Sequence, residues 1–158
     1  MKYHLLVMPK LHRTMDHGFK WFDTVQSTKG EDREPYIWVE IKEDMHQDFA
    51  VYLVNQSDHT LNSVKPHSGG FVIWDDEVIT LENNNSAFYE NVKPGEAVLV
   101  DHFNKMTDDD IWMSLDLIIQ SDQLGSIEVS VRADKGDIKR QAILWSANEV
   151  AEGVTIRK

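Results

Sequence analysis

Apolar residues in this chain recur with a period of two, as they do along β-strands, rather than with the period of a helix. The run from Phe49 to Gln56 is the most informative, because both of its alternating faces are apolar. A strand with two apolar faces needs cover on both sides, so we expect it to lie in the interior of its sheet. Turn residues from Asn55 to Asp58 follow it and predict a hairpin into a second short run at 60–65.

Similar short runs, separated by turn residues, occupy most of the remaining chain. The predicted strands are 36–42, 71–74, 78–81, 87–92, 97–103, 111–119, 127–133, 138–145 and 154–156. We expect a turn at 68–70 and a hairpin that pairs 127–133 with 138–145. A single helical turn is predicted over 147–152. About nine to eleven short strands, with at most one or two short helices, indicate an all-β fold, an antiparallel β-sandwich.

Residues 10–33 are the least strand-like part of the chain. Asp16 can cap a short helix from His17 to Gln26, and an irregular loop carrying aromatic residues is the alternative. A length of 158 residues suits one domain. We therefore expect a single sandwich domain over 1–158, with 10–33 as an irregular or short helical insertion.

Two segments carry a resemblance to a known family. An apolar strand ends in Asn-Gln-Ser-Asp within Val51 to Asp58, and a Lys-Pro-Gly-Glu turn leads into a strand within Val92 to Val100. Together they resemble bacterial immunoglobulin-like domains and cover about a third of the chain. The resemblance implies an immunoglobulin-like sandwich and implies no function. The Cys…Trp…Cys pattern of true immunoglobulin domains is absent, because the chain has no cysteine.

Charge and composition narrow the classes of partner. The formal net charge is −11, which argues against binding to nucleic acid and to an anionic membrane surface. The absence of cysteine excludes a disulfide scaffold, a cysteine nucleophile and a thiolate metal site. The apolar run near the start ends at Pro9, so no signal peptide is evident. We expect a cytoplasmic protein, and the sequence leaves export open.

Tryptophan is the first candidate for a binding site. Trp38, Trp112 and Trp145 fall on the face opposite the cleaner apolar stripe of their strands. If that face meets solvent, they form, together with Trp21, an aromatic platform for a protein partner or a sugar ring. The alternative is that residues 10–33 cover these tryptophans as a second small core.

Metal binding is the second candidate. Asp108 and Asp110 lie in a predicted loop after Asp101, and carboxylate oxygens are the ligands that calcium prefers. Three histidines, His59, His67 and His102, lie near predicted strand ends and would serve a transition metal if they converged. The alternative is that the aspartates are solvated turn residues and the histidines are scattered over the surface.

No motif for catalysis is present. The chain lacks a Gly-x-Ser-x-Gly elbow and the glycine-rich loops that hold phosphate. We therefore expect a non-enzymatic binding module without a cofactor. It would contact a protein, or a second copy in a homodimer, through a sheet face or edge. The alternatives are a carbohydrate-binding sandwich with structural calcium, and a small metal-dependent hydrolase or cupin-like enzyme that uses the histidines.

Overall fold

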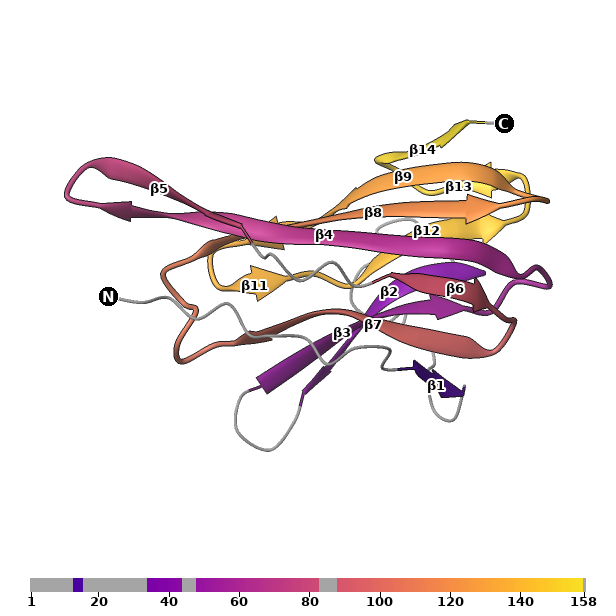
Figure 1. Cartoon of the computed structure of the whole chain (residues 1–158), viewed down its shortest axis with the longest axis horizontal. Coiled ribbons are helices and arrows are strands. Elements are labelled where there is room, and N and C mark those ends of the chain that lie inside the picture. The colour runs from indigo at the N-terminus through magenta and orange to yellow at the C-terminus, as the bar shows by residue number, and fades with distance from the viewer. Residues whose placement is uncertain (1–12, 16–33, 44–47, 83–87, 158) are drawn as a thin grey trace.

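The described part of the chain is built from antiparallel β-strands. The computed structural model describes residues 13–15, 34–43, 48–82 and 88–157. Within them, two six-stranded sheets and one two-stranded ribbon form, without a helix. Figure 1 shows the arrangement of the strands in the two sheets, and residues of both sheets form a common buried core. The prediction of an all-β, antiparallel sandwich is confirmed. The immunoglobulin-like assignment stays a prediction.

The first sheet has the order β1-β7-β3-β2-β12-β13. Its strands are β1 (Arg13–Met15), β7 (Glu96–Asn104), β3 (Asp48–Asn55), β2 (Ile37–Glu43), β12 (Gln141–Ser146) and β13 (Glu149–Val150). The strand with two apolar faces, β3, pairs with β2 on one side and β7 on the other. Its predicted interior position is confirmed.

The second sheet has the order β14-β9-β8-β4-β5. Its strands are β14 (Val154–Arg157), β9 (Gly125–Val131), β8 (Trp112–Ser121), β4 (Leu61–Trp74) and β5 (Glu77–Glu82). A further strand, β6 (Tyr89–Val92), pairs with the first part of β4. The separate ribbon consists of β10 (Ala133–Asp134) and β11 (Asp137–Ile138).

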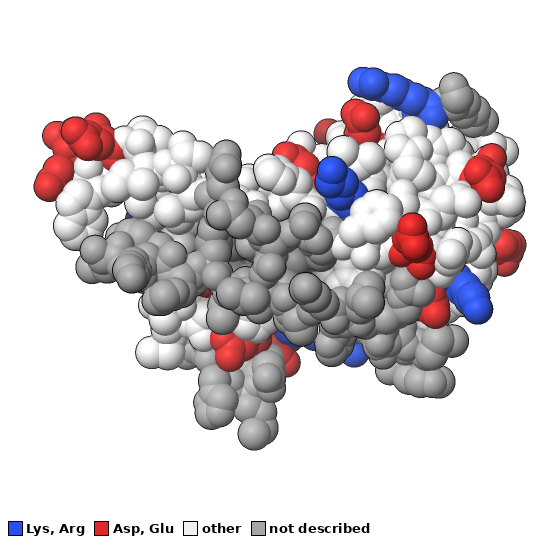
Figure 2. Space-filling model, in the orientation of Figure 1, with Lys and Arg blue, Asp and Glu red and all other residues white. Residues whose placement is uncertain are grey.

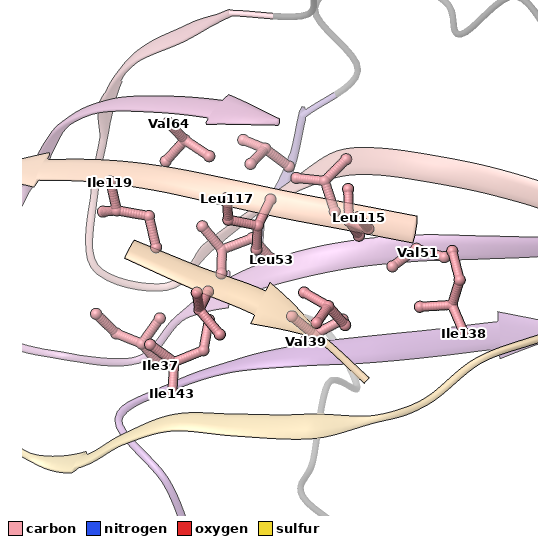
Figure 3. Packing of buried hydrophobic residues seen from close by; sticks show 14 of the residues in the cluster. Ile37, Val39, Val51, Leu53, Val64, Leu115, Leu117, Ile119, Ile138 and Ile143 are labelled. Atoms are coloured by element: carbon pink, nitrogen blue, oxygen red, sulfur yellow. The ribbon is translucent and has the colours of Figure 1, made fainter. Parts of the chain in front are cut away.

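The core lies between the two sheets and follows from the alternation in the sequence. Along β8, exposed and buried residues alternate without interruption. Leu115, Leu117 and Ile119 point inward and meet Val39, Leu53 and other residues of the first sheet, as Figure 3 shows. Since a strand turns successive side chains to opposite faces, one apolar residue in two is enough to build each wall of this core.

Two predictions for residues 61–74, which form β4, are wrong. The structure has one continuous strand where the sequence predicted a strand at 60–65, a turn at 68–70 and a new strand at 71–74. Pro66 falls between the part of β4 that pairs with β6 and the part that pairs with β5. A proline is tolerated where a strand edge has no partner. At Gly70 an added Cβ would lie 2.4 Å from the Trp112 backbone oxygen, so this glycine permits a close approach of β8 rather than a turn.

Two further predictions, near the C-terminal end, are wrong at least in part. The predicted hairpin of 127–133 with 138–145 is confirmed only at its turn, where Ala133 pairs with Ile138. Beyond it, β12 crosses to the first sheet and pairs with β2. Two hydrogen bonds hold the start of β12 and the residues before it beside the end of β9. The Arg132 backbone amide donates to Gln141 Oε1 at 2.8 Å, and the Lys139 backbone amide donates to the Arg132 carbonyl. The helical turn expected over 147–152 is a tight turn into β13, which pairs back on β12.

A buried asparagine fastens the two sheets together. Asn55 is fully buried at the end of β3, and its Nδ2 donates to the carbonyls of His59 and of Val92, the latter on β6 of the other sheet. Its Oδ1 accepts from the Ser57 amide at 3.1 Å and from the Ser57 hydroxyl at 2.6 Å. The Asn55 amide group therefore has two donated and two accepted hydrogen bonds, which match its full capacity.

We predict that Asn55→Ala lowers the free energy of unfolding by about 3 kcal/mol, because several buried polar partners lose their bonds. Equilibrium urea denaturation measures this loss. The control is Asn62→Ala, which removes a surface pair of hydrogen bonds to Asp122 and should change stability by less than about 1 kcal/mol. Equal losses in the two variants would show that Asn55 does not fasten the sheets.

Candidate interaction surface

The hairpin of β4 and β5 extends beyond the rest of its sheet. The first residue of β8, Trp112, pairs with Phe71, and the last residues of β4, 72–74, pair only with β5. Figure 1 shows the hairpin projecting past the body of the sandwich at the left of the view. We call residues 71–80, which form a two-stranded ribbon beyond the Phe71–Trp112 pair, the hairpin arm. An isolated two-stranded ribbon is marginally stable in water, so the arm depends on its root in the sheet.

The arm is closed by a two-residue turn. Asp75 and Asp76 both have positive φ, 46° and 65°, and they link the paired residues Trp74 and Glu77. Two central residues with positive φ are typical of the type I′ turn, whose twist matches that of the flanking strands. Aspartate is one of the few residues other than glycine that adopts this conformation. This turn joins the runs 71–74 and 78–81, which the sequence analysis separated by turn residues.

Both faces of the arm carry exposed apolar side chains. Ile73 and Val78, which pair directly, are 59% and 65% exposed on the outer face. On the other face, Trp74 is 50% and Ile79 is 42% exposed. Single exposed apolar residues are ordinary on a protein surface, but a contiguous group of them is typical of an interaction site.

The outer face of the arm continues onto β8 through an aromatic pair. Phe71 and Trp112 stand directly opposite each other, with ring centroids 6.0 Å apart and ring planes within 12° of parallel. Both side chains remain more than a third exposed. The pair joins Ile73 and Val78 to the sheet, so one apolar strip runs from the tip of the arm to its root.

The tip of the arm is acidic. Asp75, Asp76 and Glu77 are exposed and form no ion pair with any described residue. Figure 2 shows acidic side chains gathered at this end of the molecule, beside uncharged surface. The arm thus combines an apolar strip with uncompensated negative charge at one end.

The structure separates the four tryptophans that the sequence suggested as a platform. Trp112 lies on the exposed strip, and Trp145 near the end of β12 is partly buried. Trp21 lies outside the described residues. Trp38 is only 1% exposed, which corrects its predicted place on an exposed face. The sequence analysis did not select Trp74, and no local signal marked its exposure, because a run that is apolar on both faces predicts an interior strand.

Trp38 belongs to a second small core on the outer face of the first sheet. It packs with Val54 and Ala97, and its indole Nε1 donates to Glu40 Oε2 at 3.2 Å. Glu40 is also buried, and its Oε1 accepts from Arg140 Nε at 2.6 Å. A buried carboxylate is tolerated when it is paired and hydrogen-bonded in this way. Trp38 therefore serves packing in this structure.

The histidines suggested as metal ligands lie on separate elements. His59 follows β3, His102 lies near the end of β7, and His67 lies in the middle of β4 because that strand is continuous. Among the described residues, no group of three His, Asp or Glu side chains is placed to hold a metal ion.

The aspartates suggested for calcium also lie in different environments. Asp110 is exposed, with its Oδ1 3.6 Å from Lys135 Nζ. Asp108 is buried, and its Oδ2 accepts a 2.9 Å hydrogen bond from the Asn104 amide. Asp108 thus stabilises the loop after β7, which is the ordinary role of aspartate in turns.

Asp101 has an unusual environment for a titratable group. It is 3% exposed, its Oδ1 accepts from the His102 amide at 2.8 Å, and its Oδ2 has no hydrogen-bond partner among the described residues. Burial, which has the largest effect, and the nearby negative charge of Asp108 raise the pKa of the Asp101 carboxyl, and the hydrogen bond from the His102 amide lowers it. The net result is a pKa of about 7. At 3% exposure, this carboxyl is closed to a substrate.

No protein-family model, curated protein or solved structure matches this chain. In the part of the chain that the structure describes, no helix is long and apolar enough to cross a membrane.

We predict that Asp101 makes the fold less stable as the pH rises from about 4 to about 7. Over this range the carboxyl ionises in the unfolded chain, whereas in the folded chain it keeps its proton until the pH reaches its raised pKa. The unfolded state therefore binds fewer protons, and the free energy of unfolding falls by about 4 kcal/mol. Below pH 4 and above pH 7 this contribution is flat. Urea denaturation between pH 3.5 and 8 measures it.

Asp101→Asn isolates this effect, because the amide has no charge to bury. The variant should lose the decline between pH 4 and 7 and should equal or exceed the wild-type stability at pH 8. Asp109→Asn removes an exposed carboxylate from the loop after β7 and serves as the control. If the free energy of unfolding still declines between pH 4 and 7 in Asp101→Asn, other groups cause the decline.

Proposed function

We propose that this protein is a non-enzymatic binding module that contacts a partner protein through the hairpin arm and Trp112. The observation that carries the proposal is the exposure of large apolar side chains on both faces of one projecting ribbon. Trp, Phe and Ile at the centre of such a surface are suited to the desolvated contacts that dominate binding energy.

The position of the arm supports a contact along its edge as well as its faces. Among the described strands, β5 pairs only with β4, so its other edge is unpaired. An unpaired edge presents free backbone N–H and C=O groups, to which an extended segment can add as a further strand. The uncharged side chains of Val78, Ile79 and Thr80 do not block such an addition.

A protein partner suits this surface better than a sugar does. Carbohydrate recognition by aromatic residues uses an open ring face, whereas Phe71 and Trp112 lie nearly parallel and each covers one face of the other. The aliphatic residues beside them, Ile73 and Val78, add area suited to apolar side chains of a protein.

We predict that the double variant Ile73→Lys, Val78→Lys strongly weakens partner binding. Partners are captured with the immobilised wild-type chain, identified, purified and titrated by calorimetry. Two charges at the centre of the strip should weaken the affinity at least about 30-fold, as loss of a hot spot of about 2 kcal/mol does. Trp74→Ala should weaken it in the same direction.

The control for this experiment is Ile118→Lys. Ile118 is 40% exposed on the same outer face of the sheet, but it pairs with Lys65 and Glu128 away from the arm. All variants should keep the wild-type melting temperature within about 3 °C, since the replaced side chains are substantially exposed. A partner that binds the double variant as tightly as it binds the wild-type chain would contradict the proposal.

A further inference from the structure

The arm also indicates the chemistry of its partner. An added strand on β5 would lie beside Val78 and Ile79 and then reach the three carboxylates of the tip. Because β5 runs away from the tip, an antiparallel segment would arrive there with its C-terminal end. The contact surface therefore changes along its length from apolar to acidic.

A second copy of this chain fits that surface poorly. β5 has the sequence Glu-Val-Ile-Thr-Leu-Glu and contains no Lys or Arg. Any antiparallel pairing of two β5 strands would leave Asp75, Asp76 and Glu77 of both copies without a cation from the facing strand. Each chain also carries a net charge of −11, so two copies repel each other.

A cationic segment fits it well. Trp74 and Glu77 are directly opposite each other at the end of the ladder, so one Lys or Arg side chain can contact both the indole ring and the carboxylate. Asp75 and Asp76 add negative charge next to this pair. Complementary charge of this kind favours correct partners and raises the rate of association.

We infer that the free edge of β5 receives an extended segment of a basic partner protein. Its apolar residues alternate along the edge, and Lys or Arg at its C-terminal end meets the acidic tip. The inference rests on the proposed function, since it takes the arm to be a docking site. Nucleic acid and anionic membrane surfaces are disfavoured by the same negative charge.

The test uses two synthetic peptides of about eight residues, the usual length range of a strand. One alternates valine and threonine and ends in lysines, and the other ends in glutamates. Binding of each fluorescent peptide to the full chain is measured by anisotropy at low and at high salt. The tip variant is Asp75→Asn, Asp76→Asn, Glu77→Gln, in which asparagine retains the tolerance for positive φ that the turn requires.

A matched variant controls for the loss of net charge. Glu34→Gln, Asp58→Asn, Asp109→Asn removes three exposed carboxylates elsewhere, so both triple variants have a net charge of −11 + 3 = −8. We expect the lysine peptide to bind the wild-type chain and this control alike, and to bind the tip variant about tenfold more weakly. High salt should remove most of that difference, and the glutamate peptide should not bind.

Other results would overturn the inference in distinguishable ways. Equal binding of the two peptides, or equal weakening by the two triple variants, would refute the basic partner and leave the arm as a docking site. The same conclusion would follow if neither peptide binds while binding of a captured partner still depends on Ile73 and Val78. A dimer in sedimentation that Val78→Lys dissociates would make a second copy the occupant. Partner binding that is insensitive to every arm variant would remove the proposed function as well.

Discussion

The pairing of β4 with β8 is the constraint on which the rest of this structure depends. The two strands stay in register from Ser63 opposite Gln120 to Phe71 opposite Trp112. Because strand side chains alternate with a period of two, this one register decides which residues enter the core. A shift by one residue would turn Leu115, Leu117 and Ile119 out to solvent. The same register sets where β8 stops supporting β4, and so where the hairpin arm begins.

The hairpin arm is rooted in the sheet, and it is exposed because β4 and β5 extend beyond β8. β4 continues three residues past its last partner on β8, and β5 follows it back. A third strand would have covered one edge, and a facing sheet would have covered one face. With neither present among the described residues, apolar side chains that would elsewhere build a core stay in contact with water. This arrangement is the physical reason for assigning the arm to binding rather than to packing.

Three buried polar groups of the first sheet differ in how fully they are hydrogen-bonded. Asn55 has all of its amide hydrogen bonds, and Glu40 is held by Arg140 and Trp38. Asp101 has a partner for only one oxygen and lies near the negative Asp108. A buried carboxyl in that position is most compatible with the fold when it carries a proton. Fully satisfied groups fasten the sandwich, and the half-satisfied one makes its stability depend on pH.

The sequence by itself determined most of the strand pattern, the inward faces of β8 and β9 and the turn between 71–74 and 78–81, because these follow from local alternation and turn chemistry. Phe49 to Val54 and Phe71 to Trp74 carry the same two-sided apolar pattern, yet one is interior and the other projects into water. That difference depends on which strands pair on each side, and pairing is a long-range property that no local run encodes. For the same reason only the tertiary structure separated Trp38, in a small core, from Trp112, on the surface. It also kept His59, His67 and His102 on separate elements and buried Asp101 beside Asp108.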